Sequence, residues 1–335
     1  MDTRNIDLIN IFLVVASLMI AMKLPFELFM FSYAILGPLH YLTEINWLST
    51  KNYFIKQDRR WMLFFLVITA IGSIYPTLTL IDLGLSESLN RAITLLDGQF
   101  NTLLLTGFLF AISLLFVQEA KQLFIALGLI LVVSFYATNY LSASFAMMVA
   151  FLPTIIHVYL FTLLFVLYGA LKSKSGLGFL LGGVILSIPF IIAFVPFDSL
   201  DYKPSEGTVQ VYLHSGFPQL GAKVASLFGA LPQGKFNIFS EIALRVQVFI
   251  AFAYTYHYLN WFSKTSIIGW TKNLSTPKVI LIIGIWLLSI WIYQHDYKTG
   301  IQALFFLSVL HVTMEFPLNA VTIRELLSWK NYRGG

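Results

Sequence analysis

The sequence predicts an all-α protein, a polytopic transmembrane helical bundle of about ten spans with both termini in the cytoplasm. Of its 335 residues, 58% are hydrophobic and only 11% are charged, whereas about 25% are charged in a typical soluble domain. Apolar stretches of about 20 residues, long enough to cross a bilayer, recur along the chain. Because no other segment is long enough to fold alone, residues 1–335 are expected to form a single integral membrane domain.

Each expected span is an apolar stretch between shorter polar segments. No small-residue cleavage site follows the first stretch, which is typical of a retained span rather than a signal peptide. Spans four and five are separated only by residues 118–121, so their boundary is the least sharp. The ten predicted spans cover residues 6–22, 25–47, 61–81, 101–117, 122–138, 146–170, 177–196, 241–262, 279–294 and 300–318.

The charges of the connecting segments predict the orientation. Basic residues follow the second, sixth, eighth and tenth spans, and the loops between them are acidic or nearly neutral. In membrane proteins basic loops remain in the cytoplasm. The expected location of this chain is the bacterial inner membrane. The net charge of +5 therefore needs no nucleic-acid partner. The segment 197–240, rich in Gly, Pro and Ser, is expected to form an external loop or cap with a short re-entrant or interfacial helix.

Four histidines lie inside predicted spans, where ionisable side chains are costly and usually functional. They are His40, His157, His257 and His311, in spans two, six, eight and ten. These even-numbered spans all run in the same direction through the membrane, so they can bring four imidazoles to a similar depth. The sequence therefore predicts four metal ligands.

Two glutamates accompany these histidines at helical spacing. Glu44 follows His40 by four residues, and Glu315 follows His311 in the same way, so each pair shares a helix face. The two carboxyl groups are candidate catalytic residues, and they could also bind the metal, orient an imidazole or be solvated. The chain has no cysteine. Imidazole and carboxylate ligands without sulfur suit iron, with zinc as the alternative.

Aromatic residues make up 16% of the chain, which favours wide apolar surfaces that face lipid or an oily ligand. Near the histidines, polar and aromatic side chains in the spans fit a substrate pocket as well as an aromatic belt. These pocket candidates are Tyr33, Tyr254, Tyr256 and Asn260. The expected partners are an apolar lipid substrate and membrane lipids, and the sequence leaves partner chains undetermined.

Three short motifs around the histidines carry a family resemblance. They are Gly37-Pro38-Leu39-His40 with Glu44, the aromatic stretch 252–258 around His257 with Lys264 after it, and His311 with Glu315 and Phe316. In these segments the chain resembles the bacterial Brp/Blh-type carotene dioxygenases. The resemblance implies a helical bundle that holds iron with four histidines and cleaves a carotenoid. The paired His-x-x-x-His of that family is absent around His257, where Ala253 and Trp261 stand.

Three functions follow from these observations. The first is a membrane metalloenzyme, an iron oxygenase acting on a carotenoid or another long apolar lipid. The second is a zinc-dependent intramembrane lipid hydrolase in which Glu315 or Glu44 acts as general base. The third is a non-enzymatic transporter or membrane subunit of a larger complex, whose histidines and glutamates relay protons or stabilise helices. The sequence contains no HExxH pair, which disfavours a metalloprotease of that type.

Overall fold

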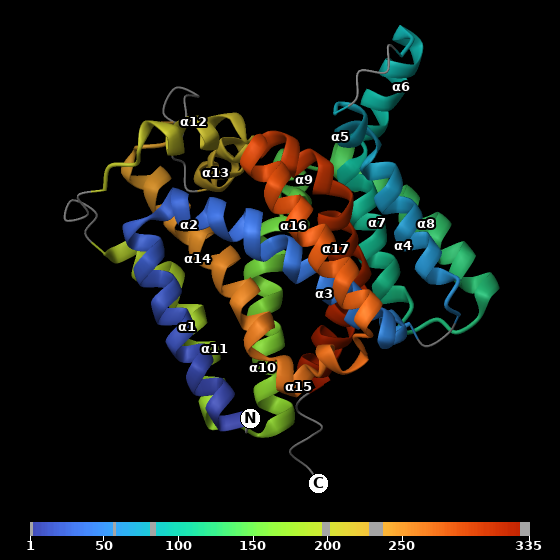
Figure 1. Ribbon diagram of the computed structural model, residues 1–335. Coiled ribbons are helices and arrows are strands. Elements are labelled where there is room, and N and C mark those ends of the chain that lie inside the picture. The colour runs from blue at the N-terminus through green and yellow to red at the C-terminus, as the bar shows by residue number, and fades with distance from the viewer. Residues whose placement is uncertain (1–2, 56–57, 81–84, 196–201, 228–236, 329–335) are drawn as a thin grey trace. The chain divides into compact units, whose positions relative to one another are not determined.

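The computed structural model describes residues 3–55, 58–80, 85–195, 202–227 and 237–328 (Figure 1). Within these ranges every regular element is a helix and no strand occurs, so the predicted all-α class is confirmed. The chain divides into two compact units. Unit 1 comprises Met1–His40 with Val158–Ile301, and unit 2 comprises Tyr41–His157 with Gln302–Gly335. Each unit is thus built from two separate stretches of the chain, and all three boundaries fall inside helices.

Six helices in the described part of the chain are long and apolar enough to cross a membrane. This finding supports the prediction of a membrane protein. The bent pair α6 (Glu87–Asp97) and α7 (Phe100–Ser113), which turns by 44°, makes a seventh if it counts as one span. The six helices are α1 (Thr3–Lys23), α8 (Ala120–Tyr140), η3 with α10 (Leu152–Ser173), α11 (Gly176–Phe194), α16 (Thr276–His295) and α17 (Tyr297–Leu327).

Three of the ten predicted spans fall on other kinds of element, so that number is not confirmed. The span 25–47 is built from α2 (Pro25–Phe31), η1 (Ser32–Leu36) and α3 (Gly37–Thr50). The span 61–81 is divided into α4 (Trp61–Gly72) and α5 (Ile74–Leu78), and residue 81 lies outside the described residues. The span 241–262 is the single helix α14 (Glu241–Ser263), which is long enough to cross but carries several tyrosines and polar side chains.

Unit 1 is organised around α14, most of whose side chains are buried. Helix α1 packs against both α14 and α11, and α11 packs against α10 (Thr162–Ser173) (Figure 1). The contact between α10 and α11 is close because small residues lie in it. A Cβ atom added to Gly178 would lie 2.7 Å from the Ala170 Cβ, and one added to Gly182 would lie 2.5 Å from the Leu167 Cδ2. Close packing at small residues is typical of membrane helices.

The predicted external segment 197–240 contains two short helices, α12 (Glu206–His214) and α13 (Phe217–Ser226), and its residues 197–201 and 228–236 lie outside the described ranges. Helix α13 packs on α14, and α12 packs on α2. The buried Tyr212 hydroxyl donates a hydrogen bond to the Gln247 Oε1 at 2.9 Å, which ties α12 to α14. The described part of this segment thus consists of two short helices packed on α2 and α14, and its external position stays a prediction.

Unit 2 has an aromatic and aliphatic core between α4, α7, α8, α9 (Ala143–Ala150) and the C-terminal part of α17. Phe65, Phe110 and Phe316 are among its fully buried side chains. The buried hydroxyls of Thr69 and Thr313 are 2.7 Å apart and join α4 to α17. The shorter connecting elements are η2 (Asn52–Phe54), α15 (Thr265–Ile268) and η6 (Trp270–Asn273).

Candidate metal centre

A wide helical turn precedes His40. The backbone N–H of Gly37 bonds to the carbonyl of Ser32, five residues earlier, which is the pattern of a π-helix. The next residue, Pro38, has no N–H to donate, so the regular ladder of the helix is interrupted here. The Trp286 indole donates to the Ile35 carbonyl at 2.8 Å and satisfies one of the backbone groups of this turn. Such turns are frequent at functional sites.

A second wide turn, η3 (Leu152–Phe161), carries His157. Pro153 is its second residue, and the Ile156 N–H reaches the Phe151 carbonyl, five residues back, at 2.9 Å. Thr154 has φ −122° and ψ −109°, outside the helical region. An extra residue in a turn rotates every later side chain about the helix axis, so the wide turn sets the direction of His157.

Unit 1 contains a histidine pair formed by α3 and α14. The Nε2 atoms of His40 and His257 lie 3.0 Å apart, and the two rings cross at 74°. Both side chains are buried. The Thr162 Oγ1 lies 2.7 Å from the Nδ1 of His257, on the far side of that ring. Aromatic rings of α14 enclose His40, with Tyr258 and Trp261 at centroid distances of 5.2 and 5.6 Å.

Unit 2 contains a second pair of the same form, between η3 and α17. The Nε2 atoms of His157 and His311 are 3.1 Å apart, and the rings cross at 75°. Tyr41 stacks on His311 with a centroid distance of 5.7 Å. The Glu315 Oε1 lies 3.8 Å from the Nδ1 of His157. As in unit 1, the Nε2 atoms face each other and an oxygen atom lies on the Nδ1 side of one ring.

All four predicted histidines are buried, and they form one pair in each unit. Each pair is a group of ring nitrogens that could hold a metal ion. Two facing Nε2 atoms form a hydrogen bond when one of them is protonated, whereas both can bind a metal ion when neither is. A donor set of neutral imidazoles suits iron, zinc, copper or nickel.

The two predicted carboxyl groups lie in unit 2, and both are buried. The carboxyl groups of Glu44 and Glu315 are close neighbours. Glu315 lies on the Nδ1 side of His157, away from the Nε2 that faces His311. An orienting role for Glu315, one of the roles predicted from the sequence, stays a prediction.

The four predicted pocket residues lie in unit 1 and do not form one wall. The rings of Tyr33 and Tyr254 are 5.8 Å apart and belong to an aromatic cluster with Phe29. The Tyr256 hydroxyl instead donates to the Asn10 Oδ1 of α1 at 3.4 Å. Asn260 is buried one turn after Tyr256. The part these residues play in substrate binding stays a prediction.

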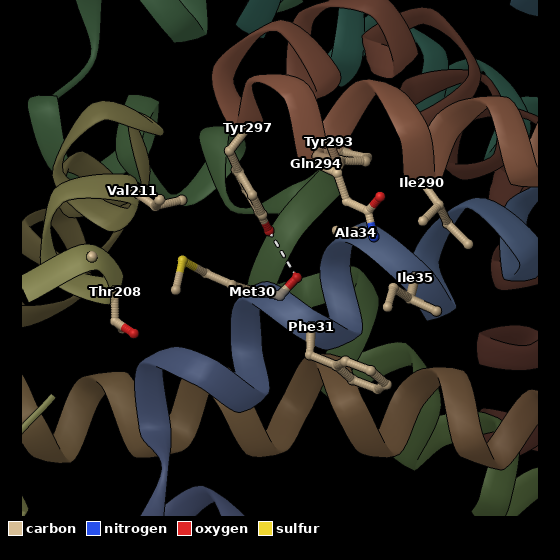
Figure 2. Close-up of a pocket in the computed structure, with 11 residues that line it drawn as sticks. Met30, Phe31, Ala34, Ile35, Thr208, Val211, Ile290, Tyr293, Gln294 and Tyr297 are labelled. Carbon is tan, nitrogen blue, oxygen red and sulfur yellow. Dashed lines mark hydrogen bonds between the residues drawn. The ribbon is translucent and has the colours of Figure 1, made fainter. Parts of the chain in front are cut away.

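An apolar cavity of about 310 Å³ lies elsewhere in unit 1 (Figure 2). Its walls come from the segment that leads to His40, from α12 and from the ends of α16 and α17. Figure 2 shows Tyr297 reaching across to Met30, whose carbonyl accepts a hydrogen bond from the tyrosine hydroxyl at 2.9 Å. Phe31, Ala34, Ile35 and Ile290 supply apolar surface, and Thr208 and Gln294 are polar exceptions.

Among the histidine contacts that sequence reasoning missed are those of Thr162 and Tyr41. Thr162 is a buried hydroxyl five residues after His157, yet it contacts His257 rather than its neighbour in sequence. Tyr41 directly follows His40, yet it stacks on His311. Both lie next to a histidine in sequence and serve a different one, so helical spacing gives no signal for them.

A comparison with known proteins finds no family model, no curated protein and no solved structure that matches this chain.

Proposed function

We propose that the four histidines bind iron, and that the chain is an iron oxygenase of the bacterial inner membrane acting on a carotenoid or another long apolar lipid. The observation that carries the proposal is the facing of Nε2 atoms in both histidine pairs, at 3.0 and 3.1 Å. The same arrangement, with Nε2 facing Nε2, occurs in both pairs. This repetition supports a shared role for the four Nε2 atoms.

The choice of iron over zinc rests on the resemblance in the histidine motifs. The separations of 3.0 and 3.1 Å fit either an N–H···N hydrogen bond or two nitrogens that share a metal ion. Iron bound in this way supplies open coordination positions at which dioxygen can react.

Two observations support an apolar substrate. The cavity of unit 1 is lined mainly by apolar side chains, and its wall is the segment that continues into His40. Phe31, at one side of this cavity, is 53% exposed, as expected for a side chain that faces lipid. A long apolar molecule could therefore pass from the bilayer into unit 1. The resemblance in the histidine motifs supports a carotenoid among such molecules.

Metal analysis of the purified protein tests the proposal. We expect about one iron per chain in the wild-type protein and its loss in each of the variants H40A, H157A, H257A and H311A. His214, whose Nδ1 lies 2.7 Å from the Gln210 carbonyl on the exposed end of α12, provides the matched control, and H214A should keep its iron.

Three results would contradict the proposal. If the folded wild-type protein contains no stoichiometric metal, the histidines are not a metal centre. If stoichiometric zinc is found and iron does not replace it, the iron oxygenase is excluded and the lipid hydrolase gains support. If H157A and H311A keep all the metal that H40A and H257A lose, only the unit 1 pair binds it.

A further inference from the structure

The contact between Thr162 and His257 is the best-defined polar contact on the outer side of a candidate ligand. The Thr162 Oγ1 and the His257 Nδ1 are 2.7 Å apart, and both side chains are buried. Thr162 is the first residue of α10, directly after the wide turn η3, whereas His257 lies on α14. The contact thus joins two helices through residues that are 95 positions apart in sequence.

The proton in this contact can lie on either atom, because a hydroxyl both donates and accepts. If the imidazole Nδ1–H donates to Thr162, the Nε2 of His257 presents a lone pair towards His40. If the hydroxyl donates to Nδ1, the Nε2 of a neutral ring carries the proton and cannot bind a metal. The choice between the two tautomers therefore decides whether His257 can act as a ligand through Nε2.

The metal centre proposed above requires the first arrangement. Only the tautomer with its proton on Nδ1 leaves the Nε2 of His257 a lone pair for a metal ion. The Thr162 Oγ1, 2.7 Å from Nδ1, is positioned to accept that proton's hydrogen bond.

We propose that Thr162 is a positioning residue, which accepts the Nδ1–H of His257 and thereby selects Nε2 as the atom that binds a divalent transition metal. The proposal rests on the metal centre proposed above. Partners that hold the outer nitrogen of a ligating histidine fix its tautomer and ring orientation, and their loss weakens metal binding about 10- to 100-fold.

Metal affinity of matched variants tests this role. We expect T162V, which keeps the shape but loses the hydroxyl, to raise the dissociation constant for Fe²⁺ about 10- to 100-fold in competition with a chelator. T162S keeps the hydroxyl and should stay within about threefold of the wild-type protein. T106V loses a buried hydroxyl away from the histidines and should bind Fe²⁺ as the wild-type protein does. Unchanged affinity in T162V, or equal losses in T162S and T162V, would overturn the proposal.

A second measurement reads the tautomer without metal. In metal-free protein with ¹⁵N-labelled histidine, the ring signals of His257, assigned by their loss in H257A, should show a protonated Nδ1 and an unprotonated Nε2. In T162V the two tautomers should mix. If His257 carries its proton on Nε2 in the wild-type protein, the role of Thr162 is wrong. If the tautomer is as expected but the protein binds no metal, the metal centre fails and Thr162 still orients the ring.

Discussion

At the scale of single residues, the site depends on which nitrogen of each imidazole faces inward. Nε2 faces Nε2 in both pairs, and the outer nitrogens of His257 and His157 have Thr162 and Glu315 nearby. The rarity of histidines in apolar stretches was enough to predict the four candidates and their carboxyl companions. It could not predict which histidines pair, because pairing depends on how distant helices pack.

Glu315 is expected to orient His157 without binding the metal. The variant E315Q keeps an oxygen that can accept from the imidazole, so its metal content should remain close to that of the wild-type protein. E315A removes that oxygen and should weaken binding about 10- to 100-fold. The measurement is the dissociation constant for Fe²⁺ of each variant. If E315Q loses its metal as fully as H157A does, Glu315 is itself a ligand.

At the scale of elements, two of the four helical segments that carry the histidines are irregular. Prolines lie near three of the histidines in the sequence, but the sequence did not show how each would affect its helix. Pro38 and Pro153 accompany wide turns in η1 and η3, whereas Pro317 lies inside the continuous helix α17. A missing N–H weakens the regular ladder, and tertiary contacts such as the Trp286 bond to Ile35 decide what replaces it.

The contact between α10 and α11 is expected to tolerate no added volume at Gly178. A Cβ there would lie 3.1 Å from the backbone Cα of Ala170, which cannot move aside as a side chain can. We expect G178A to destabilise the protein by about 1–3 kcal/mol. The control is G183A on the same helix, where nothing lies within 4 Å of an added Cβ. Thermal unfolding in detergent measures both, and equal stability of the two variants would contradict this packing.

The start of α17 is expected to depend on Asp296. Its Oδ2 accepts from the Thr299 backbone N–H at 2.6 Å, and hydrogen bonds from the Thr299 hydroxyl and backbone hold the pKa of Asp296 below its usual value. Because the folded pKa is lowered, this stabilisation is present at neutral pH and is lost as the pH falls through that pKa. D296A should cost about 1 kcal/mol at pH 7, as loss of an N-cap does. The difference in unfolding temperature from the wild-type protein should vanish in strong acid, and a constant difference would exclude the carboxylate as its cause.

At the scale of the whole molecule, apolar length was a good guide where a span is one continuous helix, as in α1, α8, α11 and α16. It failed where the chain changes direction or kind of helix within an apolar stretch, as at Ser73 between α4 and α5. The length of an apolar stretch alone does not show such a break. The cytoplasmic position of both termini stays a prediction of the loop charges.

Cysteine labelling can test that topology, because the chain contains no cysteine of its own. Single cysteines at Ser173 and Thr271 should react with a membrane-impermeant maleimide only after the cells are opened. Cysteines at Asn90 and Gln210 should react in cells whose outer membrane is permeable but whose inner membrane is intact. The opposite pattern would reverse the orientation, and an equal reaction at all four positions would contradict the predicted alternation of loops.

The division of the chain into two units has a consequence for how the protein is made. Unit 1 has all its segments once residue 301 has been synthesised, whereas unit 2 still lacks Gln302–Gly335. Until that last stretch emerges, the core of unit 2 lacks Phe316, and His157 lacks its partner His311. The His157–His311 pair is therefore the last of the two pairs to be completed during translation. A chain that ends before His311 cannot form it.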